Sequence, residues 1–408
     1  MPSFQHRFPF HYGWLIVVTG ILTLFACLGL ARFAFGMLLP GMRAGLGLAY
    51  DQLGYIGTGN FVGYLLSVAM APGLIHKFKP RITISFGLLL IAFSMVGMSQ
   101  CSTFLSLLLF YTLTGIGSGL ANIPTMVLIA HWFRRERRRA AGLMVIGNGS
   151  AIVLAGLLIP FLNQRYGAEG WRISWLLLAA VAVLVGLLVA ILVRNDPQEL
   201  ALTPIGEKQV FSEVELSTPL PANSGRTLLL LGLLYLLFGA TYMVYGTFIV
   251  TSMVDEYGFS EAVAGQFWSW VGFFSLFSGV IFGTLSDRIG RRRGLMLVFS
   301  VQTLAYLLAG SGLGEWPLLI SVFLYGIAAW AIPAIMVAAV GDFLGVTKAA
   351  AGFSLITFFF AGGQTVGPAV AGIIGEASGS FAPAFLLAAL LTGIAALLSL
   401  KLPQPAAR

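Results

Sequence analysis

Residues Trp14–Leu39 read WLIVVTGILTLFACLGLARFAFGMLL, a run in which Arg32 is the only charged side chain. A helix needs roughly 20 apolar residues to cross the hydrocarbon core of a bilayer. Backbone groups in lipid must hydrogen-bond within their own segment, which favours a helix over a loose strand. The run is also longer than the core of a signal peptide and lacks a clear small-residue cleavage site. It therefore predicts a membrane-spanning helix.

Eleven further apolar runs follow along the 408-residue chain, which is 58% hydrophobic and only 9% charged. A soluble domain carries about a quarter charged residues, and a large soluble helical core would need amphipathic stripes that these runs lack. We therefore expect an all-α integral membrane protein with twelve transmembrane helices. The predicted helices are Trp14–Leu39, Leu53–Leu74, Ile82–Met98, Phe104–Phe133, Ala140–Leu162, Ile173–Val193, Thr227–Met253, Val263–Leu285, Leu295–Leu313, Trp316–Val340, Ala350–Ile374 and Phe381–Leu402.

One long polar segment, Asn195–Gly225, leaves six predicted helices on each side. Short internal matches relate the two sides, such as IPTMVLIA from Ile123 and IPAIMVAA from Ile332. Many secondary transporters consist of two six-helix halves that surround a binding site near the midplane of the membrane. We predict an N-terminal half at 1–193, a cytoplasmic linker at 194–226 and a C-terminal half at 227–408.

Basic residues are unevenly distributed between the loops. If the N-terminus is cytoplasmic, all but four of the 23 Lys and Arg residues fall on the cytoplasmic side. The exceptions are Arg43, Arg165 and Arg172 on the opposite side, and Arg32 within the membrane. This is the positive-inside pattern, so we predict that both termini are cytoplasmic. Topology and contacts with anionic lipid therefore explain the net charge of +8, and nucleic acid is not an expected partner.

The segment Gly283–Arg293, GTLSDRIGRRR, follows the eighth predicted helix. It resembles the G-x-x-x-D-R-x-G-R-R loop of the major facilitator superfamily, and this resemblance implies two pseudo-symmetric six-helix halves. Physically, an Asp here can approach a neighbouring helix N-terminus while the arginines stay at the cytoplasmic edge. Such a cluster can latch one conformation, and a turn with topology charges is the alternative. The predicted latch residues are Asp287, Arg288, Gly290, Arg291 and His76.

His76 enters this set through the first-half copy of the loop, PGLIHKFKPR, where it stands in the place of the acid. A symmetric latch is therefore not expected. His76 makes the contact pH-dependent or is an ordinary interfacial histidine.

Further stretches are similar to the bacterial YbfB/YjiJ-like branch of the superfamily. They are ARFAFGMLLPGM from Ala31, GNFVGYLLS from Gly59, FGATYMVYGTFIV from Phe238 and GGQTVGPAVAG from Gly362. WFRRERRRAAGLMVIGNGSA and GWRISWLLLA also resemble monocarboxylate and oxalate–formate type transporters. The resemblance implies transport, in a bacterial cytoplasmic (inner) membrane, and implies no particular substrate.

Arg32 is the leading candidate for a charge that faces a ligand. An arginine near the bilayer centre costs about 2.5–3.5 kcal/mol on insertion scales. No Asp or Glu lies inside the predicted helices, because Asp51, Asp255 and Glu376 fall at or beyond helix ends. A buried charge without a partner is costly, so a wet cavity or an anionic ligand is the economical explanation. A structural anchor and outward snorkelling are the alternatives.

Aromatic and amide side chains of other helices complete the predicted site. Tyr235, Phe238, Tyr242, Tyr245 and Ile249 fall on one helical stripe, for which packing and ligand contact both stay open. Amides within helices more often bond a neighbouring helix than a ligand. The predicted substrate-binding residues are Arg32, Asn60, Tyr64, Asn122, Asn148, Tyr242, Tyr245 and Gln364.

Motifs of catalysis and of nucleotide use do not occur in the sequence. There is no GxxxxGK[ST], HExxH or GxSxG, and no Cys/His metal spacing. Cys27 and Cys101 form no disulfide framework. We therefore expect neither an enzyme nor a bound cofactor or metal.

The sequence thus predicts a secondary active transporter that works by alternating access. The expected substrate is a small organic anion, most simply a carboxylate, that moves with a proton or in exchange for another anion. One alternative is an exporter of hydrophobic or sugar-like compounds. The other is a membrane sensor that binds a ligand without moving it. The expected partners are the lipid bilayer and the small molecule, with the protein working as a monomer.

Overall fold

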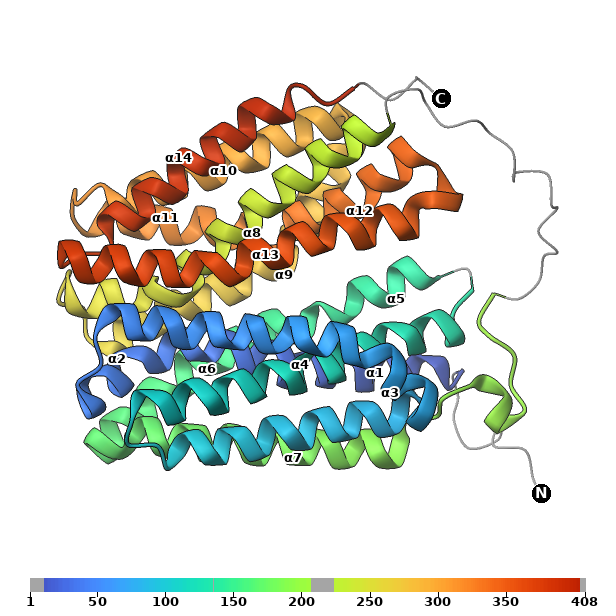
Figure 1. Ribbon diagram of the computed structural model, residues 1–408, viewed down its shortest axis with the longest axis horizontal. Coiled ribbons are helices and arrows are strands. Elements are labelled where there is room, and N and C mark those ends of the chain that lie inside the picture. The colour runs from blue at the N-terminus through green and yellow to red at the C-terminus, as the bar shows by residue number, and fades with distance from the viewer. Residues whose placement is uncertain (1–10, 135, 207–223, 404–408) are drawn as a thin grey trace. The chain divides into compact units, whose positions relative to one another are not determined.

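The computed structural model describes residues 11–134, 136–206 and 224–403 (Figure 1). Within these residues every regular element is a helix, apart from one parallel β-bridge between Phe133 and Ile205. The all-α prediction is confirmed. The described residues form two units: unit 1 within the bounds Met1–Gly47 and Gly59–Val210, and unit 2 within Leu48–Thr58 and Phe211–Arg408.

The helices of the first half of the chain begin with a nearly continuous rod and end at the polar segment. They are α1 (Gly13–Leu24), the π-helix η2 (Phe25–Phe33), α2 (Ala34–Leu46), α3 (Tyr50–Ser99), α4 (Phe104–Trp132), α5 (Arg137–Met144), α6 (Ile146–Tyr166), the 3₁₀ turn η3 (Gly167–Glu169), α7 (Gly170–Leu192) and the 3₁₀ turn η4 (Pro197–Leu200).

Seven helices follow the polar segment, of which residues 207–223 lie outside the described residues. They are α8 (Ser224–Asp255), α9 (Glu261–Ile289), α10 (Arg291–Gly310), α11 (Glu315–Ala328), α12 (Ala331–Leu344), α13 (Val346–Ser378) and α14 (Ala382–Ser399).

Ten helical segments of the described chain are long and apolar enough to cross a membrane. Two of them are too long for one crossing, because Tyr50–Ser99 has 50 residues and Arg139–Leu192 has 54. At 1.5 Å per residue each exceeds the roughly 30 Å hydrocarbon core at least twofold. The first is interrupted at Lys79, with φ 64° and ψ 160°, and the second at η3. If the two long segments are each divided at their break, the described chain has enough apolar helices for the twelve crossings that the sequence predicts.

Side-chain caps set several helix starts. The Thr103 hydroxyl accepts from the Ser106 N–H at the start of α4, and the Ser260 hydroxyl accepts from the Val263 N–H at the start of α9. Such caps satisfy N–H groups that have no partner inside the helix. At the other end of α2, Gly47 adopts a left-handed conformation with φ 63°, which glycine reaches at no steric cost.

The predicted end of the first helix at Leu39 is wrong. The structure continues through Pro40 to Leu46, although proline removes one backbone hydrogen bond. The reason is packing, because Met42 beyond the proline is fully buried and keeps the segment in the core. The middle of the same rod is a π-helix, which the sequence did not indicate.

Glycines bring α6 close to both α1 and η2 in unit 1. A Cβ on Gly29 would collide with the Cβ of Ala151, and a Cβ on Gly147 would collide with the backbone of Ile21. Small residues allow such close approach of membrane helices. The consequence is that the π-helix carrying Arg32 packs closely against α6.

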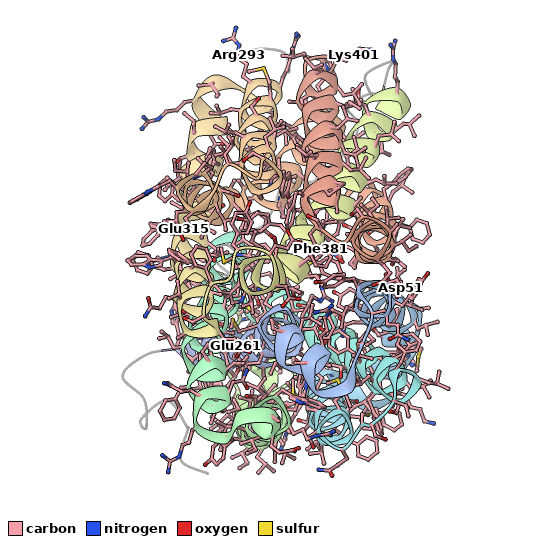
Figure 2. The ribbon with its side chains drawn as sticks, turned by 90° about the vertical axis from the view of Figure 1, so that its left-hand side faces the viewer. Asp51, Glu261, Arg293, Glu315, Phe381 and Lys401 are labelled. Atoms are coloured by element: carbon pink, nitrogen blue, oxygen red, sulfur yellow. The ribbon has the colours of Figure 1, made fainter. Side chains whose placement is uncertain are left out.

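In unit 2, α13 packs against α8 and also against the first residues of α3. A Cβ on Gly54 would strike the Pro368 carbonyl oxygen. The Tyr50 N–H donates to Glu376 at 2.8 Å, and the Tyr50 ring lies 4.7 Å from that of Phe381. Figure 2 labels Phe381 and Asp51 at this end of unit 2. The start of α3 therefore packs within unit 2, although no loop separates it from the rest of the helix.

Candidate substrate site

Arg32 lies in the π-helix η2 and is only 7% exposed. Its guanidinium carbon lies 4.8 Å from the centre of the Phe61 ring and 4.9 Å from that of Tyr64, both on α3. A cation over aromatic faces gains up to about 2 kcal/mol when it is desolvated. π-helical turns also occur frequently at functional sites. Two aromatic faces thus hold the charge in the interior of unit 1.

The edge of the same guanidinium has no hydrogen-bond acceptor. The Nε and Nη2 atoms of Arg32 are buried without a partner, and no ion pair of the described residues includes Arg32. Apart from the bonds of the helix backbone, its backbone carbonyl accepts from the Tyr111 hydroxyl at 3.3 Å. The predicted alternative of a carboxylate partner for Arg32 is therefore not found in the described part of the chain. Two N–H donors of a buried cation are therefore left without an acceptor in the described part of the chain.

Tyr64 and Asn122 adjoin this charge. The Asn122 side-chain amide donates to the Tyr64 hydroxyl oxygen at 2.8 Å, which joins α3 to α4. Because that oxygen accepts, the Tyr64 O–H stays free to donate elsewhere. The Asn122 Oδ1 atom is buried without a partner. The structure thus brings together three of the predicted residues: Arg32, Tyr64 and Asn122.

The two other predicted amides of unit 1 have different surroundings. The Asn60 amide donates to the Tyr111 carbonyl at 3.1 Å, so that side chain links α3 to α4 as interhelical amides commonly do. Asn148 lies on α6 and is 6% exposed, with Oδ1 buried and unpaired. No hydrogen bond among the described residues joins it to Arg32.

Unit 2 brings together Tyr242 and Gln364. The Gln364 amide donates to the Tyr242 hydroxyl oxygen at 2.8 Å, and the Tyr242 carbonyl accepts from the Tyr325 hydroxyl at 2.8 Å. Tyr245 is separate, because its hydroxyl pairs with that of Ser321 at 2.9 Å and its ring stacks on Tyr325 at 4.1 Å. The whole aromatic stripe of α8 is buried, so packing within unit 2 explains these side chains. The Tyr242–Gln364 pair, however, resembles the Tyr64–Asn122 pair of unit 1.

Three of the predicted latch residues, Asp287, Gly290 and Arg291, gather at the junction of α9 and α10. Arg291 forms an ion pair with Asp287, and its Nε donates to Asp342 at 2.7 Å. Gly290 between the helices has φ 90°, a conformation that favours glycine. Asp342, at the end of α12, was missed by the sequence reasoning, although it is an acid at the end of a predicted helix and next to a glycine.

The other two predicted latch residues are not in this cluster. No hydrogen bond or ion pair of Arg288 or His76 occurs among the described residues, and the His76 side chain is exposed on α3. Phe61, like Asp342, was also missed, although it stands one helical turn before Tyr64. Within the described residues no three metal-ligating side chains cluster.

Apolar helices of membrane length that enclose buried polar clusters in each of two units define a multi-pass membrane transporter. The chain belongs to the family of the uncharacterised MFS-type transporter YbfB, whose model matches residues 24–400. This family is part of the major facilitator superfamily, as the loop at Gly283–Arg293 predicts.

Curated relatives are transporters of small molecules. The phosphoglycerate transporter protein of Salmonella typhimurium is 27% identical over 46% of this chain and 41% of its own length, so the match spans less than half of that relative. The hexuronate transporter of Bacillus subtilis is 23% identical over 92% of this chain and 91% of its own. The oxalate:formate antiporter of Oxalobacter formigenes is 23% identical over 71% and 67%.

Solved transporters share the fold. A bacterial homologue of the human lysosomal transporter Spinster aligns with a TM-score of 0.76 at 16% identity, covering 96% of this chain and 97% of that one. The nucleoside transporter NupG aligns with a TM-score of 0.73 at 14% identity, covering 96% and 99%. These likenesses confirm the fold of the superfamily.

Proposed function

We propose that this transporter carries a small organic anion whose carboxylate binds Arg32. The observation that supports the proposal most strongly is the buried guanidinium edge, whose Nε and Nη2 atoms have no acceptor among the described residues. A planar carboxylate matches two parallel N–H donors of arginine. A buried charge left without a counter-charge is costly, and an anionic ligand removes that cost each time it binds.

The charge count favours a monoanion over a phosphate. Arg32 is the only basic residue well inside a predicted membrane helix. One guanidinium neutralises one negative charge, whereas a phosphate monoester carries up to two near neutral pH and would leave part of its charge uncompensated in a medium of low dielectric. Among the relatives named above, hexuronate and oxalate transporters handle carboxylates and the phosphoglycerate transporter a phosphorylated one.

Alternating access of two six-helix halves, 1–193 and 227–408, is the proposed mechanism. Because no Asp or Glu lies inside the predicted helices, we propose that a proton travels with the weak acid or that one anion exchanges for another. We also propose a bacterial cytoplasmic membrane, cytoplasmic termini and a monomeric working form, with no catalytic step and no nucleic-acid partner.

Uptake of radiolabelled carboxylates into proteoliposomes tests the proposal. Arg32→Gln should lower uptake by about tenfold or more, since a hydrogen bond to a charged group contributes about 1.5–3 kcal/mol. Arg165→Gln is the matched control, because Arg165 also stacks on a tyrosine, 5.9 Å from the Tyr166 ring, but is exposed. Imposing a pH gradient separates proton cotransport from anion exchange.

Full uptake by Arg32→Gln would contradict the proposal. Movement of uncharged compounds by that variant would instead support the exporter alternative.

A further inference from the structure

We infer that the substrate is a 2-hydroxycarboxylate, an acid with a hydroxyl group on the carbon next to the carboxyl group. The inference rests on the proposed function, since it assigns the carboxylate to Arg32. It adds a second recognition element, formed by Tyr64 and Asn122, that a plain carboxylate cannot satisfy.

Beside the two donors of Arg32, Asn122 Oδ1 is an acceptor that is buried without a donor. A carboxylate carries no hydrogen to give this oxygen. An unpaired buried polar atom lowers stability until it finds a partner. The Oδ1 atoms of Asn60 and Asn148 are also unpaired, but the Asn122 oxygen belongs to the side chain that bonds Tyr64 beside the charge, so a ligand group that donates would satisfy it there.

The Tyr64 hydroxyl oxygen already accepts from the Asn122 amide at 2.8 Å. Its own hydrogen is therefore available to a ligand acceptor. Side by side, the Tyr64 O–H and the Asn122 Oδ1 offer one donor and one acceptor. A single alcohol group fits both, because a hydroxyl accepts one hydrogen bond while it donates another.

The Tyr64 side chain sets the spacing between the two recognition elements. The face of the Tyr64 ring lies 4.9 Å from the guanidinium carbon of Arg32, and the hydroxyl of the same ring meets Asn122. One rigid side chain therefore separates the charged group from the alcohol-binding pair. The hydroxyl nearest to a carboxylate is the one on the adjacent carbon, so a 2-hydroxy acid is the smallest molecule that reaches both.

Matched pairs of acids test this inference on the purified full-length protein in nanodiscs. Lactate is compared with propionate, and mandelate with phenylacetate, by isothermal titration. In at least one pair the hydroxylated acid should bind about tenfold more tightly or better, because the plain acid leaves Asn122 Oδ1 unpaired. Equal affinity within both pairs would overturn the inference.

Variants assign the preference to its residues. Asn122→Leu and Tyr64→Phe should each weaken binding of the hydroxylated acid to the level of the plain acid, and should change the plain acid less than about twofold. Gln302→Leu, which removes a buried amide of unit 2 that belongs to no predicted site, should keep the preference. A loss of equal size for both acids in Asn122→Leu and in Tyr64→Phe would show a structural role and contradict the inference.

The inference and the proposed function fail in different ways. Arg32→Gln should weaken binding of both acids in a pair by about tenfold or more. If that variant binds both acids as the wild type does, the proposed carboxylate site is wrong. If it weakens both while the wild type shows no hydroxyl preference, the carboxylate site stands and only the 2-hydroxy assignment fails.

Discussion

The Tyr64 ring lies with its centre 4.9 Å from the guanidinium carbon of Arg32, while the two donor atoms Nε and Nη2 of that arginine have no acceptor among the described residues. An aromatic face attracts a cation without using its N–H groups as a carboxylate would. The side chain is thereby held in the interior while its hydrogen-bonding edge has no acceptor among the described residues. This combination suits an arginine that binds and releases an anion.

Phe61 supplies the second aromatic face, 4.8 Å from the guanidinium carbon. Phe61→Leu should weaken carboxylate binding several-fold, because a desolvated cation–π contact contributes about 0.5–2 kcal/mol. Titration calorimetry measures the change. Phe161→Leu is the control, since Phe161 is 58% exposed on α6 and should leave the affinity unchanged. Equal affinities for Phe61→Leu and the wild type would show that this ring does not hold the arginine ready for its ligand.

The ion pair between Arg291 and Asp342 should govern the rate of transport. Arg291 is 14% exposed and its Nε lies 2.7 Å from Asp342, which ties the start of α10 to the end of α12. Asp342→Asn should lower the maximal uptake rate several-fold and leave the KM within about twofold, because a latch acts on conformational change rather than on binding. Proteoliposome kinetics separate the two parameters.

Two further variants place this latch. Asp287→Asn should have a smaller effect than Asp342→Asn, because Asp287 is 59% exposed and exposed ion pairs contribute little. Arg292→Gln, next to Arg291 in the same basic run, should behave as the wild type. A rate for Asp342→Asn that equals that of Arg292→Gln would count against the latch.

Gly54 allows α3 to pack closely on α13 inside unit 2. A Cβ at this position would meet the Pro368 carbonyl oxygen and would lie 3.1 Å from the Cα of Gly372 and 3.2 Å from that of Ala369. Gly54→Ala should therefore lower the melting temperature by several degrees, consistent with about 1–3 kcal/mol for overpacking. Gly283→Ala has open space around its Cβ and should be neutral or slightly stabilising. Thermal unfolding in detergent compares them, and equal melting temperatures would refute the tight contact.

Lys79 interrupts α3 with a backbone conformation, φ 64° and ψ 160°, that non-glycine residues rarely adopt. Lys79→Gly should raise the free energy of unfolding by about 1 kcal/mol. Lys77→Gly, two residues earlier within the helix, should lower it by a similar amount, because glycine is about 1 kcal/mol worse than a good helix former. Opposite shifts of the melting temperature are expected. A lower melting temperature for both variants would mean that the break at Lys79 carries no strain.

Much of the fold follows from the sequence because apolar runs of membrane length have few alternatives to a helix. The errors lie where packing decides. The apolar run predicted a helix end at Leu39, but the helix continues through Pro40 to Leu46, with Met42 buried. Within the π-helix at Phe25–Phe33, Gly29 closely approaches Ala151 on α6, and no local pattern reveals this contact. The start of α3 packs in unit 2 without any loop to signal it.

The candidate site was predictable to a similar extent. Arg32 stood out because a charge in an apolar run is costly. The hydrogen bond between Tyr64 and Asn122 could not be predicted, because residues 58 positions apart meet only through the packing of α3 on α4. Phe61 read as an ordinary apolar residue, and Asn60 read as a ligand group although its amide bonds the Tyr111 carbonyl. Which face of a helix meets a ligand is a property of the packed structure.

The most direct test of the central claim compares an acid with its uncharged amide in the wild type and in Arg32→Gln. Lactate and lactamide have nearly the same shape, so the ratio of their affinities reports the charge that the site recognises. The account predicts that the wild type binds the acid about a hundredfold more tightly, and that Arg32→Gln binds the two alike. The same ratio in both proteins would contradict it.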